Sequence, residues 1–103
     1  MDLDLIQKLV NERKMKWSTH VAARMHERNI KRMDVLNCLL HGEIIEEYPD
    51  DFPTPSCLVF GTTLKNEVIH VVAGCDDSTV YIITVYRPDS DSFESDLKTR
   101  KER

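Results

Sequence analysis

The sequence predicts an α+β fold in which two to three N-terminal helices pack on a four-stranded antiparallel meander sheet. Apolar residues recur at helical spacing through residues 1–41, and the period changes to two between residues 43 and 88. The connections between the later apolar runs are too short for a crossover helix, so adjacent strands should be antiparallel. Residues 89–103 form a tail. Because the 103 residues contain no repeat and no internal boundary, we expect a single domain over 1–103.

Local signals set the limits of the three helices. The first is expected over about residues 2–15. A second begins where Ser18 or Thr19 can cap the free N–H groups, and it ends near Asn29, which tolerates the left-handed conformation. The third ends at Gly42. The apolar positions of the first and third helices are Leu3, Ile6, Leu9, Val10, Ile30, Met33, Leu36, Leu39 and Leu40.

Four apolar runs of period two predict the strands. The proline-rich residues 49–55 cannot complete a ladder and form a loop after the first strand. Lys65-Asn66 is typical of a hairpin turn, and Asp76-Asp77-Ser78 joins the last two strands. The strands are expected at Glu43–Tyr48, Ser56–Thr63, Val68–Cys75 and Val80–Tyr86.

His70 interrupts an otherwise apolar strand. If the last turn pairs Cys75 with Val80, His70 lies opposite Val85. The face of His70 then holds Val72, Tyr81 and Ile83, and the reverse face holds Ile69, Val71, Ala73, Ile82, Thr84 and Tyr86. His70 is either a core histidine with satisfied hydrogen bonds or an acid–base group. Tyr86 is either a half-buried strand residue or an exposed phenol that donates a proton or stacks on a base.

The tail begins acidic and ends basic, which suits the dipole of a helix. Ser92 could cap such a helix, with Phe93 and Leu97 one turn apart. A short docked helix and a frayed end are the two alternatives for this segment.

Composition excludes several classes of protein. With 41% hydrophobic and 31% charged residues, the chain is typical of a folded globular domain. No apolar run approaches the ~20 residues that span a bilayer, so we expect no membrane partner. The N-terminus lacks the basic flank and apolar segment of an export signal, and we therefore expect a cytoplasmic location.

The three cysteines are too widely separated for a zinc ribbon, and we expect them to be small buried residues. Cys38 and His41 lie three residues apart, but no second pair with ligand spacing accompanies them. The sequence therefore predicts neither a metal site nor a cofactor.

His20, Arg24 and Arg28 recur every four residues and form one stripe along the second helix. Imidazole can move protons near neutral pH, and guanidinium binds phosphate in a fixed geometry. Residues 1–41 carry a net charge of +3 and the remainder −7, although the whole chain carries −4. The stripe either contacts RNA phosphates or is the solvated face of an amphipathic helix.

Several short motifs occur in a fixed order along the chain. They are Ser18–Met25, Glu27–Ile30, Asp34-Val35, Gly42–Asp51, Pro55–Leu58, His70–Val72, Ile83–Asp89 and Lys98–Lys101. In this order they resemble the bacterial domain-of-unknown-function family 4258, and the resemblance covers nearly the whole chain from Trp17 onward.

The resemblance implies a RelE-like, barnase-like toxin fold and the toxin half of a type II toxin–antitoxin module. The partner would be an antitoxin with a zinc ribbon and a helix-turn-helix. Toxins of that fold are typically messenger-RNA endoribonucleases that act with or on the ribosome. The catalytic set carried over is His20, Arg24, His70 and Tyr86, and the RNA-binding set is Arg28, Lys98, Arg100 and Lys101.

The implied chemistry needs no metal. A base removes the ribose 2′-hydroxyl proton, the oxygen attacks the adjacent phosphate, and an acid protonates the leaving 5′-oxygen. His20 or His70 would be the base or acid, Arg24 the phosphate clamp and Tyr86 the orienting residue. Two alternatives remain: a catalytically silent module that binds a protein partner, and a small metal or ligand sensor that uses the histidines.

Overall fold

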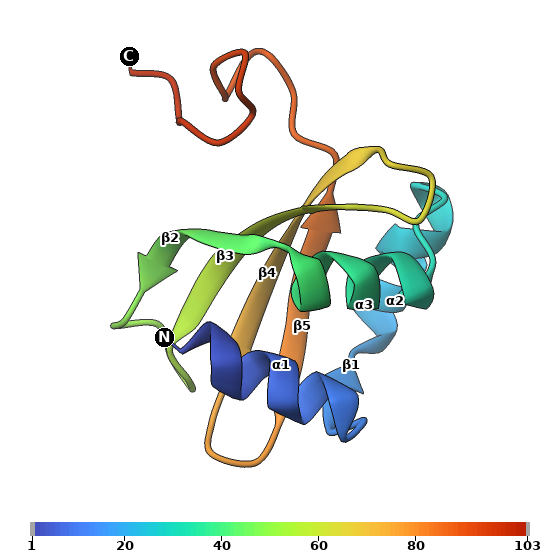
Figure 1. Cartoon of the computed structure of the whole chain (residues 1–103), viewed down its shortest axis with the longest axis vertical. Helices are drawn as coiled ribbons and strands as arrows, with labels where there is room; N and C mark the ends of the chain where they lie inside the picture. The colour runs from blue at the N-terminus through green and yellow to red at the C-terminus, as the bar shows by residue number, and fades with distance from the viewer. Residues whose placement is uncertain (1, 103) are drawn as a thin grey trace.

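The computed structural model describes residues 2–102 and has the α+β class that the sequence predicts (Figure 1). The helices are α1 (Leu3–Asn11), α2 (Thr19–Glu27) and α3 (Arg32–His41), and the strands are β1 (Met15–Trp17), β2 (Glu43–Tyr48), β3 (Ser56–Thr62), β4 (Val68–Cys75) and β5 (Val80–Tyr86). No helix within residues 2–102 is both long and apolar enough to cross a bilayer.

The sheet has five strands and is mixed, so the prediction of a four-stranded antiparallel meander was wrong in this respect. The strand order is β1-β5-β4-β3-β2, and β1 pairs parallel with β5. The first helix ends at Asn11, short of the predicted residue 15, and the three-residue β1 follows. A strand this short carries little periodicity, and its partner is distant in the sequence. Its pairing therefore left no local signal.

The ends of α2 and α3 are built as the sequence predicts. The Ser18 hydroxyl accepts a hydrogen bond from the Val21 N–H at 3.0 Å, and Asn29 takes a φ of 54° just after α2. Gly42 ends α3, but in an extended conformation with a φ of −91°. Glycine is required at this position because there is no room for a side chain. A Cβ would lie 2.3 Å from the Phe60 carbonyl oxygen and 2.4 Å from that of Cys38.

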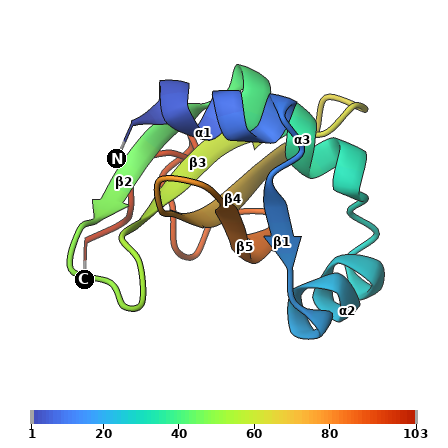
Figure 2. The same ribbon diagram turned by 90° about the horizontal axis from the view of Figure 1, so that it is seen from below.

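The two faces of the sheet have different covers. Figure 2 shows α1 and α3 across one face, and α2 packs beside β5 near the β1 edge. This helix-covered face is apolar, and its core includes Ile69, Val71, Ala73, Val80, Ile82 and Val85 from β4 and β5. Cys38, Cys57 and Cys75 are free thiols buried in this core, as predicted.

A β-bulge in β5 changes the predicted register of His70. Cys75 pairs with Val80 as predicted, but the register shifts by one residue beyond Ala73. His70 therefore lies opposite Tyr86 instead of Val85. A one-residue shift moves a side chain to the other face, so Tyr86 lies on the face of His70 and not on the reverse face. That part of the prediction was wrong.

Residues 89–102 form neither of the alternatives predicted for the tail. They make an irregular segment, here called the strap, with one isolated bridge between Phe93 and Arg100. Asp89 and Asp96 accept hydrogen bonds from backbone N–H groups two and three residues later, which favours turns over a helix. Leu97 has a φ of 59°. The strap packs on the sheet face opposite α1 and α3 (Figure 2), and Phe93 is buried there.

We predict that Gly42→Ala destabilises the fold by about 2–3 kcal/mol, because its Cβ would contact two backbone oxygens that cannot move independently. Urea unfolding measures the loss. Gly74→Ala is the matched control, since the nearest atom to its Cβ is the side-chain hydroxyl of Thr54, which can rotate away. Equal losses in the two variants would contradict this account.

Candidate functional site

A row of side chains crosses four strands on the strap-covered face. Glu43 pairs with Phe60, Phe60 with His70, and His70 with Tyr86. The centre of the His70 ring lies 6.0 Å from that of Phe60 and 5.2 Å from that of Tyr86, both in edge-to-face geometry. Phe93 of the strap completes the aromatic surroundings, with its ring centre 4.6 Å from that of His70. His70 thus lies at the centre of an aromatic cluster.

His70 is completely buried, and both of its ring nitrogens have partners. Nε2 lies 2.7 Å from the Leu97 carbonyl oxygen, and Nδ1 lies 3.2 Å from the Tyr86 hydroxyl. A carbonyl only accepts, so Nε2 carries the proton. Burial lowers the pKa of His70 and keeps the ring neutral, and Nδ1 is then the acceptor for the Tyr86 O–H. The contacts therefore place the imidazole proton on Nε2 and make the Tyr86 hydroxyl the donor in its hydrogen bond to Nδ1.

Beside this pair, Glu46, Tyr48 and Arg100 form a charged group. Arg100 donates to both carboxylate oxygens of Glu46, at 3.1 Å from Nε and 3.0 Å from the terminal nitrogen. The Tyr48 hydroxyl donates to the same carboxylate. Two-point pairing of this kind fixes the plane of the guanidinium. Arg100 also stacks 4.8 Å from the centre of the Phe93 ring, which holds it against the cluster.

The pKa shifts in the group follow from these contacts. The hydrogen bond from Arg100 lowers the pKa of Glu46, so this carboxylate stays ionised. Burial and the Glu46 hydrogen bond raise the pKa of Tyr48 to about 12. Burial raises the pKa of Tyr86, which is half-buried, although the Arg100 charge opposes that change. The phenols are therefore proton donors at neutral pH, and Glu46 is an acceptor.

The bulge in β2 brings Glu46 to this face. In a regular strand, Glu43 and Glu46 would point to opposite faces, because they lie an odd number of residues apart. The register shifts between Ile44 and Glu46, so that Glu46 faces Leu58 across the ladder. Lys98 pairs with Glu43 at 2.7 Å and lies 4.7 Å from the centre of the Phe60 ring. Both glutamates therefore bind basic side chains of the strap.

The structure brings together His70, Tyr86, Arg100 and Lys98 from the residues that the sequence analysis selected. His20 and Arg24 lie elsewhere, exposed on α2, and Arg24 pairs with Glu27 at 3.2 Å. No interaction within residues 2–102 links either of them to the His70 group.

Two other predicted RNA-binding residues lie outside the His70 group. Arg28 ends α2, donates to the Val85 carbonyl at 2.6 Å, and so connects that helix to β5. Lys101 is exposed. The roles predicted for these residues stay predictions.

Glu46 and Tyr48 belong to the group but were in neither the catalytic nor the RNA-binding set predicted from the sequence. Both lie in the Gly42–Asp51 motif that carried the family resemblance, which was the available signal. Their strand, Glu43–Tyr48, does not alternate strictly between polar and apolar residues, so residue type alone does not say which of its side chains share a face. Only the bulge shows that Glu46 and Tyr48 share the face of His70.

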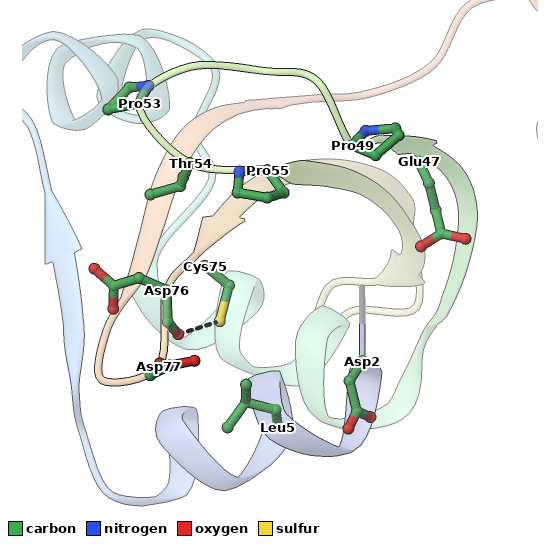
Figure 3. A pocket seen from close by; sticks show the side chains of 10 residues that line it. All are labelled: Asp2, Leu5, Glu47, Pro49, Pro53, Thr54, Pro55, Cys75, Asp76 and Asp77. Carbon is green, nitrogen blue, oxygen red and sulfur yellow. Dashed lines mark hydrogen bonds between the residues drawn. The ribbon is translucent and has the colours of Figure 1, made fainter.

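A cavity of about 520 Å³ lies at the other end of β4 (Figure 3). Its wall includes three prolines and four carboxylates, the latter from Asp2, Glu47, Asp76 and Asp77, and none of its lining residues is basic. The Cys75 thiol at its edge donates to the Asp76 carbonyl at 3.1 Å. Such a wall repels phosphates, so this cavity does not suit RNA.

Other reactive groups are sparse in the described chain. Within residues 2–102, no three histidine, cysteine or acidic side chains are grouped so as to hold a metal ion. Burial raises the pKa of Cys38 to about 12 and that of Cys57 to about 11, and it also raises the pKa of Cys75. These thiols stay protonated at neutral pH and are weak nucleophiles.

Comparison with known proteins identifies the family. The domain of unknown function DUF4258 matches residues 17–87. The chain belongs to this family. The matched range begins in β1 and ends one residue after Tyr86, so it includes Glu46, Tyr48, His70 and Tyr86, while the strap lies outside it. Neither a curated protein nor a solved structure matches the chain.

We predict that His70 makes the protein less stable as the pH falls below about 6.5, the pKa of an unfolded histidine. Burial lowers the pKa in the folded state, so the unfolded state binds more protons in this window. Unfolding free energy should fall by up to about 1.4 kcal/mol per pH unit between the folded and unfolded pKa values.

Urea titrations between pH 7.5 and 5 measure the slope. His70→Gln should flatten it, whereas the matched control His41→Gln, which removes an exposed histidine, should leave it unchanged. A wild-type slope that persists in His70→Gln would contradict the assignment.

Proposed function

We propose that this protein is a metal-independent endoribonuclease with a RelE-like fold and the toxin of a type II toxin–antitoxin module. The observation that carries the proposal is the grouping of His70, Tyr86, Arg100 and Glu46 on the sheet face opposite the helices. These side chains supply a proton acceptor, a proton donor and a phosphate-binding cation in two hydrogen-bonded pairs on one face of the sheet. Phosphodiester cleavage by the neighbouring 2′-hydroxyl needs these three functions.

In the proposed reaction, His70 Nδ1 takes the proton of the ribose 2′-hydroxyl, and the 2′-oxygen forms a bond to phosphorus. The bond from phosphorus to the 5′-oxygen breaks, and Tyr86 gives that oxygen its phenolic proton. Arg100 binds the phosphorane oxygens as their charge grows. The proton then passes from His70 to the tyrosinate along the contact between them. The products are a 2′,3′-cyclic phosphate and a 5′-hydroxyl, and the enzyme returns to its starting state.

Two features of the group favour these roles. In the chain without RNA, the Leu97 carbonyl holds the His70 proton on Nε2, which leaves the lone pair of Nδ1 directed at the Tyr86 hydroxyl. In the chain without RNA, Glu46 holds the guanidinium of Arg100 beside this pair by two hydrogen bonds, in a geometry that a phosphate can replace. His20 and Arg24, from the original catalytic set, would instead contact RNA beyond the cleaved phosphate, because α2 presents both to solvent.

The proposed protein partner is an antitoxin of the zinc-ribbon or helix-turn-helix type, and RNA, free or on the ribosome, is the substrate. The resemblance of the ordered motifs is the basis for this pairing. Such a module acts in the cytoplasm, where its messenger-RNA substrate is found.

One observation favours a second candidate, a catalytically silent module of the same fold that binds a protein partner. His70 is completely buried and fully hydrogen-bonded, as expected of a structural core histidine. Large apolar side chains are also exposed elsewhere, with Phe52 95% and Leu64 63% accessible. Apolar groups of this kind favour contacts with another protein.

An RNA cleavage assay in the presence of a metal chelator separates the two candidates. We expect the wild-type chain to cut RNA and leave 2′,3′-cyclic phosphate ends. Tyr86→Phe should lower kcat about 10²- to 10⁴-fold through loss of the acid, and Arg100→Gln about 10²- to 10³-fold through loss of phosphorane stabilisation. His26→Gln, which alters an exposed histidine outside the group, is the matched control. If RNA stays intact after incubation with the folded wild-type chain, the proposed nuclease activity is refuted.

Induced expression in bacteria tests the toxin role and the part of His20. Growth should stop with the wild-type chain and continue with His70→Gln, since only the latter lacks the proposed base. We expect His20→Gln to keep most of the toxicity, because no hydrogen bond or ion pair within residues 2–102 links His20 to the His70 group. Growth rate and transcript length are the readouts. If His20→Gln abolishes both effects and His70→Gln does not, the catalytic centre is on α2.

A further inference from the structure

The strap holds to the sheet through a small number of side chains. Phe93 is 2% exposed, the Leu97 carbonyl accepts from His70, and Lys98 and Arg100 pair with glutamates of β2. Most of the remaining strap residues are exposed: Asp89, Ser90, Asp91, Glu94, Ser95, Asp96, Thr99, Lys101 and Glu102. Two basic side chains therefore supply all the ion pairs between strap and sheet that are found within residues 2–102.

Both ion pairs are accessible to solvent. The side chains of Lys98 and Glu43 are 40% and 55% exposed, and those of Arg100 and Glu46 are 53% and 21% exposed. Pairs of this kind are weak and are screened by salt. A phosphate group offers the same two-point acceptor geometry to a guanidinium as a carboxylate does. Phosphates can therefore compete with the two glutamates for the strap.

The closed strap is incompatible with direct contact between His70 and a substrate. His70 has no exposed surface, and the Leu97 carbonyl and the Tyr86 hydroxyl occupy its two nitrogens. The Phe93 ring covers the imidazole from the strap side. A ribose hydroxyl can reach Nδ1 only after the strap has left this face.

We propose that residues 89–102 are an autoinhibitory cover, held closed by the pairs of Lys98 with Glu43 and Arg100 with Glu46, and that RNA phosphates open it. The phosphates take both basic side chains from the glutamates, and the strap leaves the sheet. His70 and Tyr86 are then exposed beside an RNA that Lys98 and Arg100 already hold. The inference rests on the proposed function in naming RNA as the competitor.

A charge swap on the full-length chain tests the cover. Glu43→Lys places a like charge beside Lys98, so we expect modification of His70 by diethylpyrocarbonate to be at least about threefold faster than in the wild type. Lys98→Glu should have the same effect by itself. The double variant, Glu43→Lys with Lys98→Glu, restores an opposite-charge pair and should return the rate close to that of the wild type. Mass spectrometry measures the modification at each histidine.

Other histidines of the same chain serve as internal references for the modification rate of His70. His20 and His26 are exposed on α2, and their rates should stay constant in every variant. His41 is not a reference, because it lines the same pocket as Glu43 and Lys98. Glu12→Lys is the matched control, because Glu12 pairs with Lys14 at 3.3 Å far from the strap in the sequence. An unchanged His70 rate in both single variants would overturn the proposal. So would a double variant that reacts as fast as the single ones, because that result would indicate unfolding rather than release of a charge pair.

Hydrogen exchange with polyuridylate tests RNA as the competitor. The strap amides of Glu94 and Lys101 bond within the strap, at 2.8 Å to Thr99 and 2.9 Å to Ser92. We expect polyuridylate to speed their exchange severalfold while the amides of α1 stay unchanged. Absence of binding, or unchanged or slower exchange of the strap amides, would overturn the proposal.

Combining this readout with the cleavage assay distinguishes the two hypotheses. If RNA is cleaved but strap exchange is not faster, the autoinhibitory role of the strap is overturned and the nuclease proposal stands. If strap exchange is faster but RNA is never cleaved, the result supports opening of the strap by RNA and refutes the nuclease proposal.

Discussion

The arrangement of the candidate site depends on one irregularity, the β-bulge in β5. Without it, Tyr86 would face α1 and α3 together with Ile82, and His70 would lie opposite Val85. The extra residue moves Tyr86 across the sheet and makes it the hydrogen-bonding partner of His70. The bulge in β2 moves Glu46 in the same way. Two shifts of a single residue thus place a proton acceptor, a proton donor and a carboxylate on one face.

The two faces of the sheet then meet different physical requirements. The helix-covered face is a continuous apolar core, and burial of this apolar surface stabilises it. The other face buries His70, whose polar atoms must all be satisfied because an unpaired buried group would destabilise the fold. Tyr86 and the Leu97 carbonyl provide those partners. Most other contacts of the strap are exposed and charged, so this second cover is weaker than the helical one.

Charge is distributed in a way that the net value of −4 conceals. The carboxylates of Asp2, Asp76 and Asp77 line the cavity at one end of β4, whereas Glu43 and Glu46 are paired with strap cations. The three aspartates of the cavity repel polyanions. Glu43 and Glu46 each hold a basic side chain of the strap, and a phosphate can compete with them for it. An acidic chain can therefore still present a phosphate-binding site.

Local sequence signals were sufficient to predict the α+β class, the start of α2 after Ser18 and its end just before Asn29, and the four longer strands, and they also indicated His70 and Tyr86 as candidates. These features follow from local periodicity, capping and residue type. The position of β1, the partner of His70, the place of Glu46 and the path of the strap became clear only from the three-dimensional structure. Each of these depends on pairing between distant segments or on a one-residue shift in a ladder. The partner of a strand is not written in its own residues, and a bulge moves a side chain to the other face without any change of residue type.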